Sequence, residues 1–246
     1  MHDTGKTLSP PPAPDPCWAW FLDIDGTLIE LTGEPSSLRK PHRLPELLEA
    51  LRRRVGGAVA LVSGRSVSNM RALIAPAELP LAGCHGLERR LADGRMLRAP
   101  SSPLLAEARA TLRAFADDHP GVFLEDKECT LALHYRQVPH LEWACRDAVE
   151  RTVSGDLGML SGKMVYEVKP RNFSKGTALR SFMESTPFQG RRPVFLGDDL
   201  TDEDGFEAAA ALGGIGILVG PVRPTRAEFR LADVPSLHAW LAALGL

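Results

Sequence analysis

Three apolar runs end on polar residues and predict buried strands. They are AWFLDID (residues 19–25), AVALVSGR (58–65) and PVFLGDD (193–199). Near-continuous apolar character is typical of strands that are covered on both faces. Between the first two runs, the segment RLPELLEALRRRV (43–55) repeats leucine at helical spacing. The pattern therefore predicts a strand-helix-strand unit and a parallel sheet.

The polar ends of these runs are expected to meet at one edge of the sheet. Ligands of open α/β sheets bind beyond the carboxyl ends of the strands. Further core elements are predicted downstream: a helix in FSKGTALRSFMES (173–185), the apolar run GIGILVG (214–220), and a final helix. That helix carries on one side Leu237, Trp240, Leu241 and Leu244.

The middle of the chain follows a different pattern. Two helical stretches, SPLLAEARATLRAFADDH (102–119) and PHLEWACRDAVERTV (139–153), flank GVFLEDKECTLALHYR (121–136), which predicts a hairpin with its turn near residues 126–128. The alternation of its strands, and of MVYEVKP (164–170), places apolar residues on one face and Glu, Lys and His on the other. The pattern is typical of a small sheet with a polar underside that could act as a lid.

Length and composition fit a globular α/β protein with one insertion. The chain has 246 residues, of which 44% are hydrophobic, enough for a core with an inserted second domain. We expect a Rossmann-like core over residues 18–82 and 168–246, an inserted α/β cap over 83–167, and a disordered, Pro-rich N-terminus over 1–17.

Charge and cysteine usage narrow the class of protein. The formal net charge is −2 and the sequence has no basic run, which argues against nucleic acid or an anionic membrane surface as partner. No stretch approaches the ~18 apolar residues of a membrane span. The four cysteines lack CxxC and zinc-ligand spacing, so we expect reduced thiols and a cytoplasmic protein.

The candidate chemistry lies in the carboxylates that follow the strands. Asp23 and Asp25 are two positions apart and would point to the same side of a strand, with Gly26 allowing a turn. Each close pair of carboxylates at ~4 Å costs about 4 kcal/mol at an effective dielectric constant of ~20. Asp198 and Asp202 would add to this repulsion, so a cation is expected. An all-oxygen cluster suits Mg²⁺ better than zinc.

Each segment also has a simpler interpretation. DIDGTL could be an Asx-type turn, and LVSGR an ordinary turn or a helix N-cap. GDDLTDED could be the solvated acidic start of a helix, in which Asp202, Glu203 and Asp204 would favour the helix dipole; we expect that role for Glu203 and Asp204.

Taken together, the segments resemble the haloacid dehalogenase (HAD) superfamily of phosphotransferases. The shared features are DxDGT at residues 23–27, Ser63, Lys175 in FSKG, and GDDLTDED at 197–204, in that order. GCHGLERR, LEDKECTLALHYRQ, YEVKPRNFSKGTAL and VFLGDDLTDEDGF are similar to the trehalose-6-phosphate phosphatase family. The resemblance implies a HAD core with a C2-type cap. It also implies Mg²⁺-dependent hydrolysis of trehalose 6-phosphate to trehalose and phosphate through an aspartyl phosphate.

The resemblance assigns a role to each motif position. Asp23 would be the nucleophile, and Asp25 would protonate the leaving sugar oxygen and then activate water. Ser63 would bind the phosphoryl oxygens, and Lys175 would neutralise Asp23 and the phosphate. Asp202 would hold a metal-bound water or position Lys175. The Mg²⁺ ligands would be Asp23, the backbone carbonyl of Asp25, and Asp198.

The predicted lid supplies candidates for sugar recognition. Hydrogen bonds are expected to select the disaccharide, because it carries no charge beyond its phosphate. Arg65 and His85 could reach the same cleft or brace a loop, and Arg136 is a candidate salt-bridge partner. His134 could instead be an exposed strand residue. The candidate sugar ligands in the lid are Glu125, Lys127, His134 and Glu167. Closure of the lid is expected to exclude water and complete the sugar site.

Two positions depart from the family pattern, and three rival functions stay open. Asn172 and Glu128 stand where glycine is common; Asn tolerates left-handed backbone geometry better than Glu does. One rival is a phosphatase for another sugar phosphate, such as sucrose phosphate or a hexose phosphate. Another is a phospho-acceptor or sugar-phosphate-binding module without turnover, and the third is a structural α/β domain. We expect a monomer with a small-molecule substrate.

Overall fold

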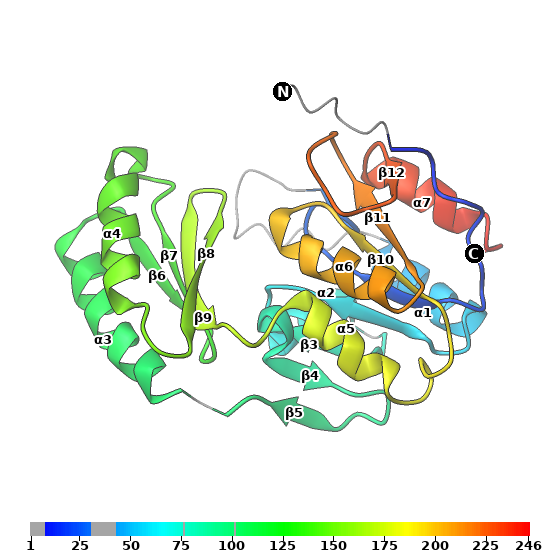
Figure 1. Cartoon of the computed structure of the whole chain (residues 1–246), viewed down its shortest axis with the longest axis horizontal. Helices are drawn as coiled ribbons and strands as arrows, with labels where there is room; N and C mark the ends of the chain where they lie inside the picture. Colours follow the sequence, from blue (N-terminus) through cyan, green and yellow to red (C-terminus); the bar gives the residue numbers. More distant parts are fainter. Residues whose placement is uncertain (1–7, 31–42, 76, 101) are drawn as a thin grey trace. The chain divides into compact units, whose positions relative to one another are not determined.

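The computed structural model describes residues 8–30, 43–75, 77–100 and 102–246. It divides into two compact units (Figure 1), each of which is described by itself. The first unit is formed by Met1–Leu97 together with Ser174–Leu246, and the second by Arg98–Phe173.

The first unit contains an eight-stranded sheet in the order β12-β11-β10-β1-β2-β3-β4-β5. The six strands from β12 to β3 run parallel, as the sequence predicts, and β4 pairs antiparallel with β3. The strands are β1 (Ala19–Leu22), β2 (Val59–Val62), β3 (Leu81–Gly83), β4 (Glu88–Arg90), β5 (Met96–Arg98), β10 (Pro193–Gly197), β11 (Ile215–Val219) and β12 (Phe229–Leu231).

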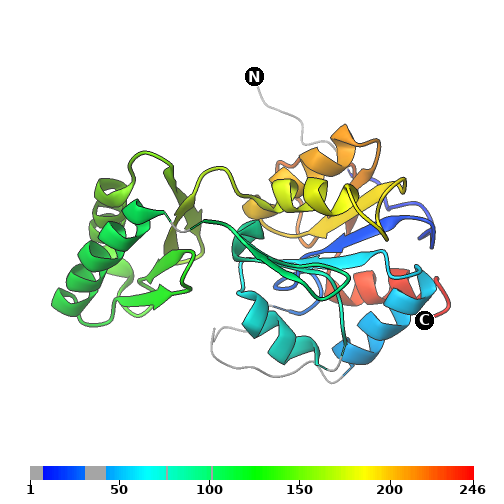
Figure 2. The ribbon, with the colours of Figure 1, turned by 90° about the horizontal axis from the view of Figure 1, so that it is seen from below.

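Helices cover both faces of this sheet. Figure 2 shows α5 and α6, in yellow and orange, on one face, and α1, α2 and α7 on the other. Helical residues on both sides are buried against alternating residues of the strands, which is why the strands are apolar throughout. The helices are α1 (Leu44–Arg54), α2 (Val67–Ile74), α5 (Lys175–Met183), α6 (Glu203–Ala211) and α7 (Val234–Ala242), with 3₁₀ turns at Cys84–Gly86 and Leu200–Asp202.

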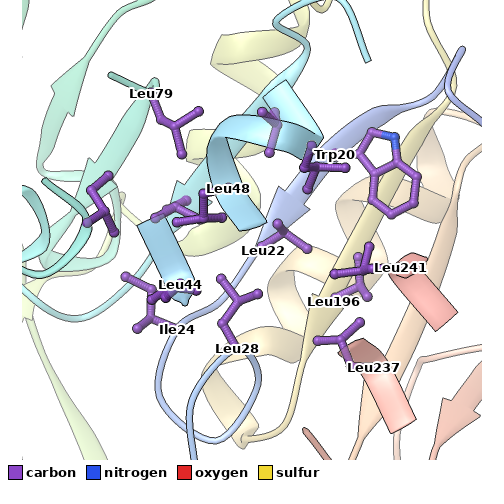
Figure 3. Packing of buried hydrophobic residues seen from close by; sticks show 14 of the residues in the cluster. Trp20, Leu22, Ile24, Leu28, Leu44, Leu48, Leu79, Leu196, Leu237 and Leu241 are labelled. Carbon is purple, nitrogen blue, oxygen red and sulfur yellow. The ribbon is translucent and has the colours of Figure 1, made fainter. Parts of the chain in front are cut away.

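Strand β1 is the centre of the core. Trp20 and Leu22 face the side of α1 and α7, whereas Phe21 faces the side of α5 and α6. Figure 3 shows Leu48 of α1 and Leu241 of α7 near the first pair. Burial of each such side chain contributes about 1.5–3 kcal/mol, so this packing fixes the strand that carries the DxDGT segment.

The second unit is a four-stranded antiparallel sheet in the order β6-β7-β9-β8, packed against two helices. The predicted hairpin is confirmed: β6 pairs with β7, and Glu128 in its turn has a φ of 67°. Leu131, Leu133 and Tyr166 are buried against the helices. The elements are α3 (Pro103–Asp118), β6 (Phe123–Asp126), β7 (Leu131–His134), the 3₁₀ turn Pro139–Leu141, α4 (Glu142–Thr152), β8 (Leu157–Gly162) and β9 (Val165–Pro170).

The boundaries of the second unit differ from the predicted 83–167. Strand β4 is hydrogen-bonded to β3 and belongs to the same sheet, so the first unit continues to Leu97. At the other end, β9 pairs with β7 and β8, so the predicted boundary at 168 would cut a strand. Strand pairing, which the apolar pattern does not reveal, decides both positions.

The N-terminal segment is ordered where the structure describes it. The carbonyl of Ser9 accepts a hydrogen bond from the Arg230 N–H at 3.0 Å, and the carbonyl of Pro12 accepts one from Trp240 Nε1 at 2.9 Å. The prediction of disorder over residues 1–17 is therefore wrong for residues 8–17. Extended prolines keep their carbonyl oxygens as acceptors, which the first unit uses. Residues 1–7 lie outside the described residues.

Two further features bear on the predicted class of protein. None of the helices in the described ranges has the length and apolar character needed to cross a membrane. All four cysteines of the chain lie in those ranges, and none forms a disulfide.

Candidate active site

Acidic and polar residues gather at the carboxyl edge of the parallel sheet. Asp23, Ser63 and Asp198 follow directly on β1, β2 and β10. Leu22 at the end of β1 is in register with Leu196 of β10 and Leu61 of β2, so the carboxyl ends of the three strands lie side by side. This register brings Asp23 together with residues about 175 positions away, as topology predicts for parallel strands.

Lys175 lies between two carboxylates at this edge. Its Nζ donates hydrogen bonds to Asp23 Oδ1 at 2.8 Å and to Asp202 Oδ1 at 2.7 Å, and all three side chains are buried. Lys175 is the first residue of α5, whose preceding Ser174 forms a capping box with Thr177. The cap fixes the start of the helix and with it the point from which the lysine reaches the carboxylates.

Asp202 fixes the backbone of the loop after β10. Its Oδ2 accepts hydrogen bonds from the N–H groups of Asp198 at 2.9 Å and Asp199 at 3.0 Å, and the residue is fully buried. The simpler interpretation as a solvated acidic helix start is therefore wrong for Asp202. Both carboxylate oxygens of Asp202 have protein donors. At Asp198, Oδ1 accepts from Thr27 Oγ1, and a carboxylate oxygen lies within 4.8 Å of one of Asp23.

The charge balance favours a cation at the edge. Burial raises the pKa of Asp23 to about 7, against the opposing effect of Lys175, with Asp198 adding to the increase. Burial and the neighbouring Asp202 and Asp199 raise the pKa of Asp198 to about 7. Burial lowers the pKa of Lys175, but Asp202 and Asp23 outweigh it and keep the amine charged. One ammonium group thus faces several carboxylates.

The geometry also fits a small divalent ion. Oxygen atoms of Asp23, Asp198 and Asp202 lie within 4.8 Å of one another. Gly26 has a φ of 85°, and a Cβ there would lie 2.2 Å from Asp198 Oδ2, so only glycine lets the two loops approach this closely. The donor set is all oxygen, which is typical of Mg²⁺ and unlike zinc sites.

Asp25 is paired with Arg65. The guanidinium donates from Nε to Asp25 Oδ2 and from Nη2 to Asp25 Oδ1, both at 2.6 Å. The two side chains are only partly buried, with exposed fractions of 25% and 33%. Asp25 therefore does not cap a local turn with its side chain, as the simpler interpretation proposed. Arg65 lies at the site but binds a carboxylate.

Ser63 and His85 lie in adjoining loops. The Oγ of Ser63 accepts a hydrogen bond from the Arg65 N–H at 3.2 Å, and Ser66, rather than Ser63, caps α2. The N–H of His85 donates to the Ser63 carbonyl at 3.0 Å. The buried His85 ring lies so close to Gly64 that a Cβ there would be 2.9 Å from Nε2. His85 thus braces the loop that carries Ser63.

The second unit brings its four predicted residues into one cluster. Lys127 Nζ lies 3.4 Å from Glu167 Oε1 and 4.0 Å from Glu125 Oε2. His134 Nε2 lies 3.0 Å from Glu125 Oε2, and this contact is the main cause that lowers the pKa of Glu125. His134 is therefore not a solvated residue of an exposed strand face.

Sequence reasoning did not assign two buried threonines to these sites. Thr27 Oγ1 donates to Asp198 Oδ1 at 3.2 Å, and Thr130 Oγ1 donates to Glu167 Oε1 at 2.5 Å. Both side chains are fully buried. Signals existed for both, since Thr27 belongs to the DxDGT segment and Thr130 shares a strand face with His134. Neither signal identified which carboxylate each hydroxyl would hold.

The sheet order, with helices on both faces and a second unit inserted after β5, is the α/β fold of a solved phosphatase of the HAD superfamily. A phosphatase of this superfamily from Bacteroides thetaiotaomicron has the same fold, with a TM-score of 0.63 at 18% identity, covering 93% of this chain and 95% of that chain.

The trehalose-phosphatase family model matches residues 21–235, so the chain belongs to the trehalose-phosphatase family. The chain is 41% identical over 228 residues to the trehalose-6-phosphate phosphatase of Escherichia coli K12, covering 91% of this chain and 85% of that protein. A solved trehalose-6-phosphate phosphatase related protein superposes with a TM-score of 0.73 at 25% identity, covering 90% of this chain and 94% of that one.

Proposed function

We propose that this protein hydrolyses trehalose 6-phosphate to trehalose and phosphate with the help of Mg²⁺. The observation that carries the proposal is the buried contact of Lys175 with Asp23, at the edge where Asp198 also lies, in a chain of the trehalose-phosphatase family. Phosphoryl transfer requires a positioned nucleophile and positive charge around the phosphoryl oxygens. The site combines both requirements in a buried setting.

Asp23 is the proposed nucleophile. Lys175 holds Oδ1, so Oδ2 is the oxygen proposed to attack phosphorus. The bond between phosphorus and the sugar oxygen breaks, and Asp25 gives that oxygen its proton. Water then attacks the aspartyl phosphate, transfers a proton to Asp25, and releases phosphate and the free Asp23 carboxylate. Two easier displacements replace one difficult hydrolysis.

Asp23, Asp198 and the backbone carbonyl of Asp25 would hold Mg²⁺. When bound, Mg²⁺ would neutralise the carboxylates and the charge that spreads over the phosphoryl oxygens. Asp202 is assigned to positioning, because Lys175 and two backbone N–H groups already occupy its oxygens. Ser63 would donate its hydroxyl to a phosphoryl oxygen, and Lys175 would balance charge on both Asp23 and the phosphate.

The second unit is proposed to recognise the disaccharide. Glu125, Lys127, His134 and Glu167 form a cluster of donors and acceptors that could satisfy several sugar hydroxyls at once. A site built in this way rejects sugars that leave its buried polar groups unpaired. Arg65 and His85 stay candidates for contact with the substrate from the first unit.

The test is phosphate release from trehalose 6-phosphate beside the 6-phosphates of sucrose, glucose and mannose, with Mg²⁺ or with EDTA. We expect a strong preference for trehalose 6-phosphate, loss of activity in EDTA, and no activity in Asp23→Asn. Equal rates on all four substrates would keep the chemistry and refute the proposed substrate. A folded protein that releases no phosphate would favour the binding module without turnover.

The role of the second unit needs its own variants. Glu125→Ala and Lys127→Ala should raise KM for trehalose 6-phosphate and weaken the preference over glucose 6-phosphate. Arg146→Ala, which removes an exposed i,i+4 ion pair of α4 with Glu150, is the matched control and should behave as the wild type. Unchanged substrate preference in both test variants would refute sugar recognition by this cluster.

We also propose a monomer in the cytoplasm. The spacing of the four cysteines, which lacks CxxC and zinc-ligand patterns, supports a reducing compartment. Sedimentation equilibrium should give the mass of one chain, and fractionation of expressing cells should recover the activity with cytoplasmic markers. The mass of a dimer would contradict the proposed monomer, and recovery of the activity with another compartment would contradict the proposed cytoplasmic location.

A further inference from the structure

Arg223, which follows β11, contacts the backbone of the loop that carries Asp198. Its Nε donates to the Asp198 carbonyl at 3.1 Å, and its Nη2 donates to the Asp199 carbonyl at 2.6 Å. Hydrogen bonds from a charged guanidinium are stronger than those between neutral groups. The loop after one strand is thus held by a residue from the loop after the neighbouring strand.

The backbone N–H groups of Asp198 and Asp199 are also held by hydrogen bonds. Asp202 Oδ2 accepts from the N–H groups of Asp198 and Asp199, so Asp202 and Arg223 together hold two amide donors and two carbonyl acceptors. The backbone of the Asp198 loop is therefore constrained on both polar groups of each residue. These backbone contacts fix the position of the Asp198 carboxylate, whose Oδ1 also accepts a hydrogen bond from the Thr27 hydroxyl.

Arg223 is itself fixed by Glu203, the first residue of α6. Its Nη1 forms an ion pair with Glu203 Oε1, and the exposed fractions of the two side chains are 20% and 13%. The Glu203 carboxylate also accepts from Thr225 Oγ1 at 2.8 Å and from the Arg226 N–H at 2.6 Å. The arginine therefore reaches the loop from a preorganised position.

We propose that Arg223 is a positioning residue for the divalent cation, acting through the backbone carbonyls of Asp198 and Asp199. The proposal rests on the Mg²⁺ site of the proposed function and adds a residue outside the four motifs. Arg223 donates to backbone carbonyls and so does not occupy the Asp198 carboxylate, whose Oδ1 accepts from Thr27 and which lies within 4.8 Å of the Asp23 carboxylate. Its charge also offsets part of the repulsion among the neighbouring aspartates.

Arginine suits this position better than lysine. The planar guanidinium directs donors in fixed directions and here serves three carbonyls, those of Asp198, Asp199 and Pro224, and the Glu203 carboxylate at the same time. A lysine would bring one compact ammonium group, which cannot reach all of these acceptors in the same geometry. Arg223→Lys should therefore restore only part of the function.

The test measures Mg²⁺ binding directly, by calorimetry on the full chain without substrate. Loss of a residue that orients a metal ligand typically costs about 10- to 100-fold in affinity, and we expect Arg223→Ala to raise the Kd for Mg²⁺ by that factor. Arg223→Lys should lie between this variant and the wild type. In activity assays, the Mg²⁺ concentration for half-maximal rate should rise more than kcat falls.

Arg226→Ala is the matched control. It removes a positive charge three positions away, but its side chain is 60% exposed and pairs with Glu207 at 3.6 Å. The backbone N–H of residue 226, which donates a hydrogen bond to Glu203, is retained in the alanine variant. Wild-type Mg²⁺ affinity is expected. A loss equal to that of Arg223→Ala would assign the effect to net charge and overturn positioning.

Two further outcomes overturn the proposal in distinguishable ways. Unchanged Mg²⁺ affinity in a folded Arg223→Ala would refute the role of Arg223 alone. No Mg²⁺ binding by the wild type would refute the metal site and the proposed function with it. If Arg223→Ala does not fold, Glu203→Gln takes its place: it weakens the support of the arginine and should raise the Kd for Mg²⁺ in the same direction. Wild-type affinity in a folded Glu203→Gln would refute the proposal.

Discussion

The Arg65 guanidinium holds both carboxylate oxygens of Asp25 in a fork of two 2.6 Å hydrogen bonds. Asp25 is the proposed acid, so its carboxyl group must meet the sugar oxygen in one orientation. The pair lies between the loops after β1 and β2 and restricts how Asp25 can turn. Orientation of a catalytic group is a large part of enzymatic rate enhancement.

Arg65→Met should lower kcat/KM for trehalose 6-phosphate by about 10- to 100-fold, because a hydrogen bond to a charged group is worth about 1.5–3 kcal/mol. The measurement is steady-state kinetics with saturating Mg²⁺. Arg71→Met in α2 removes an exposed arginine that pairs weakly with Glu78 at 4.0 Å and should leave the kinetics unchanged. Kinetics of Arg65→Met that match the wild type would show that Asp25 needs no such partner.

Asp202→Asn should destabilise the metal-free protein. The aspartate is fully buried and accepts from Lys175 and from two backbone N–H groups. An asparagine would direct an NH₂ group at one of these donors and leave the lysine charge under-compensated. Removal of one partner of a buried ion pair costs about 3–5 kcal/mol, and urea unfolding should show a loss of this size. Leu200→Ala, at a side chain that is 67% exposed, is the control.

A double-mutant cycle tests whether Lys175 and Asp202 stabilise the fold as a pair. Lys175→Met alone leaves Asp23 and Asp202 buried without their cation, whereas the double variant Lys175→Met, Asp202→Asn removes one charge of each sign. We expect the double variant to lose less free energy of unfolding than the sum of the two single losses. Additive losses would mean that the two residues stabilise the fold independently.

Stability should depend on pH and Mg²⁺ together. The pKa values of Asp23 and Asp198 rise from 3.8 in the unfolded chain to about 7 in the fold. Between these values the metal-free native state binds more protons than the unfolded chain, so its free energy of unfolding falls as pH increases. Mg²⁺ binds the deprotonated carboxylates and should offset this loss.

Thermal unfolding with Mg²⁺ or EDTA checks this dependence. Mg²⁺ should raise the Tm more at about pH 8 than at about pH 5, because protons compete for the same carboxylates at the lower pH. Asp198→Asn should reduce the Mg²⁺-dependent gain at the higher pH. An equal gain at both pH values would exclude competition between Mg²⁺ and protons at these residues.

Glu128→Gly should stabilise the second unit. Glu128 adopts a φ of 67° in the β6–β7 turn, a left-handed geometry that costs an L-residue about 1–2 kcal/mol. Glycine removes this cost but loses more entropy on folding, so the expected gain is up to about 1 kcal/mol. The backbone hydrogen bonds of residue 128 to Asp126 and Arg109 would remain.

Glu128→Ala is the matched control for the turn. It also removes the exposed ion pair with Arg98, but it keeps a Cβ in the left-handed geometry. We expect no increase in Tm for the alanine variant. An increase as large as that of Glu128→Gly would assign the effect to the lost side chain instead of the backbone.

The sequence by itself determined the parallel core and the convergence of its motifs. Apolar runs such as residues 19–22, each followed by polar residues, predict strands covered on both faces, and the helical leucine spacing in 43–55 predicts a helix that covers one of them. Parallel strands joined by helices leave their carboxyl ends at one edge. The meeting of Asp23 with Asp198 therefore follows from topology, without knowledge of any side-chain contact.

Only the tertiary structure decided which groups pair and where the units end. Local patterns do not specify partners, because register and side-chain orientation depend on packing between distant segments. The sequence pattern places residues 88–90 in the insertion, but in the structure they pair with β3. The prolines near residue 12 predict disorder, but Trp240 of α7 donates a hydrogen bond to the Pro12 carbonyl. Arg65 with Asp25, and Arg223 with the Asp198 loop, are long-range contacts of the same kind. Chain topology fixes the edge of the sheet at which chemistry occurs, and three-dimensional packing selects the residues that hold it there.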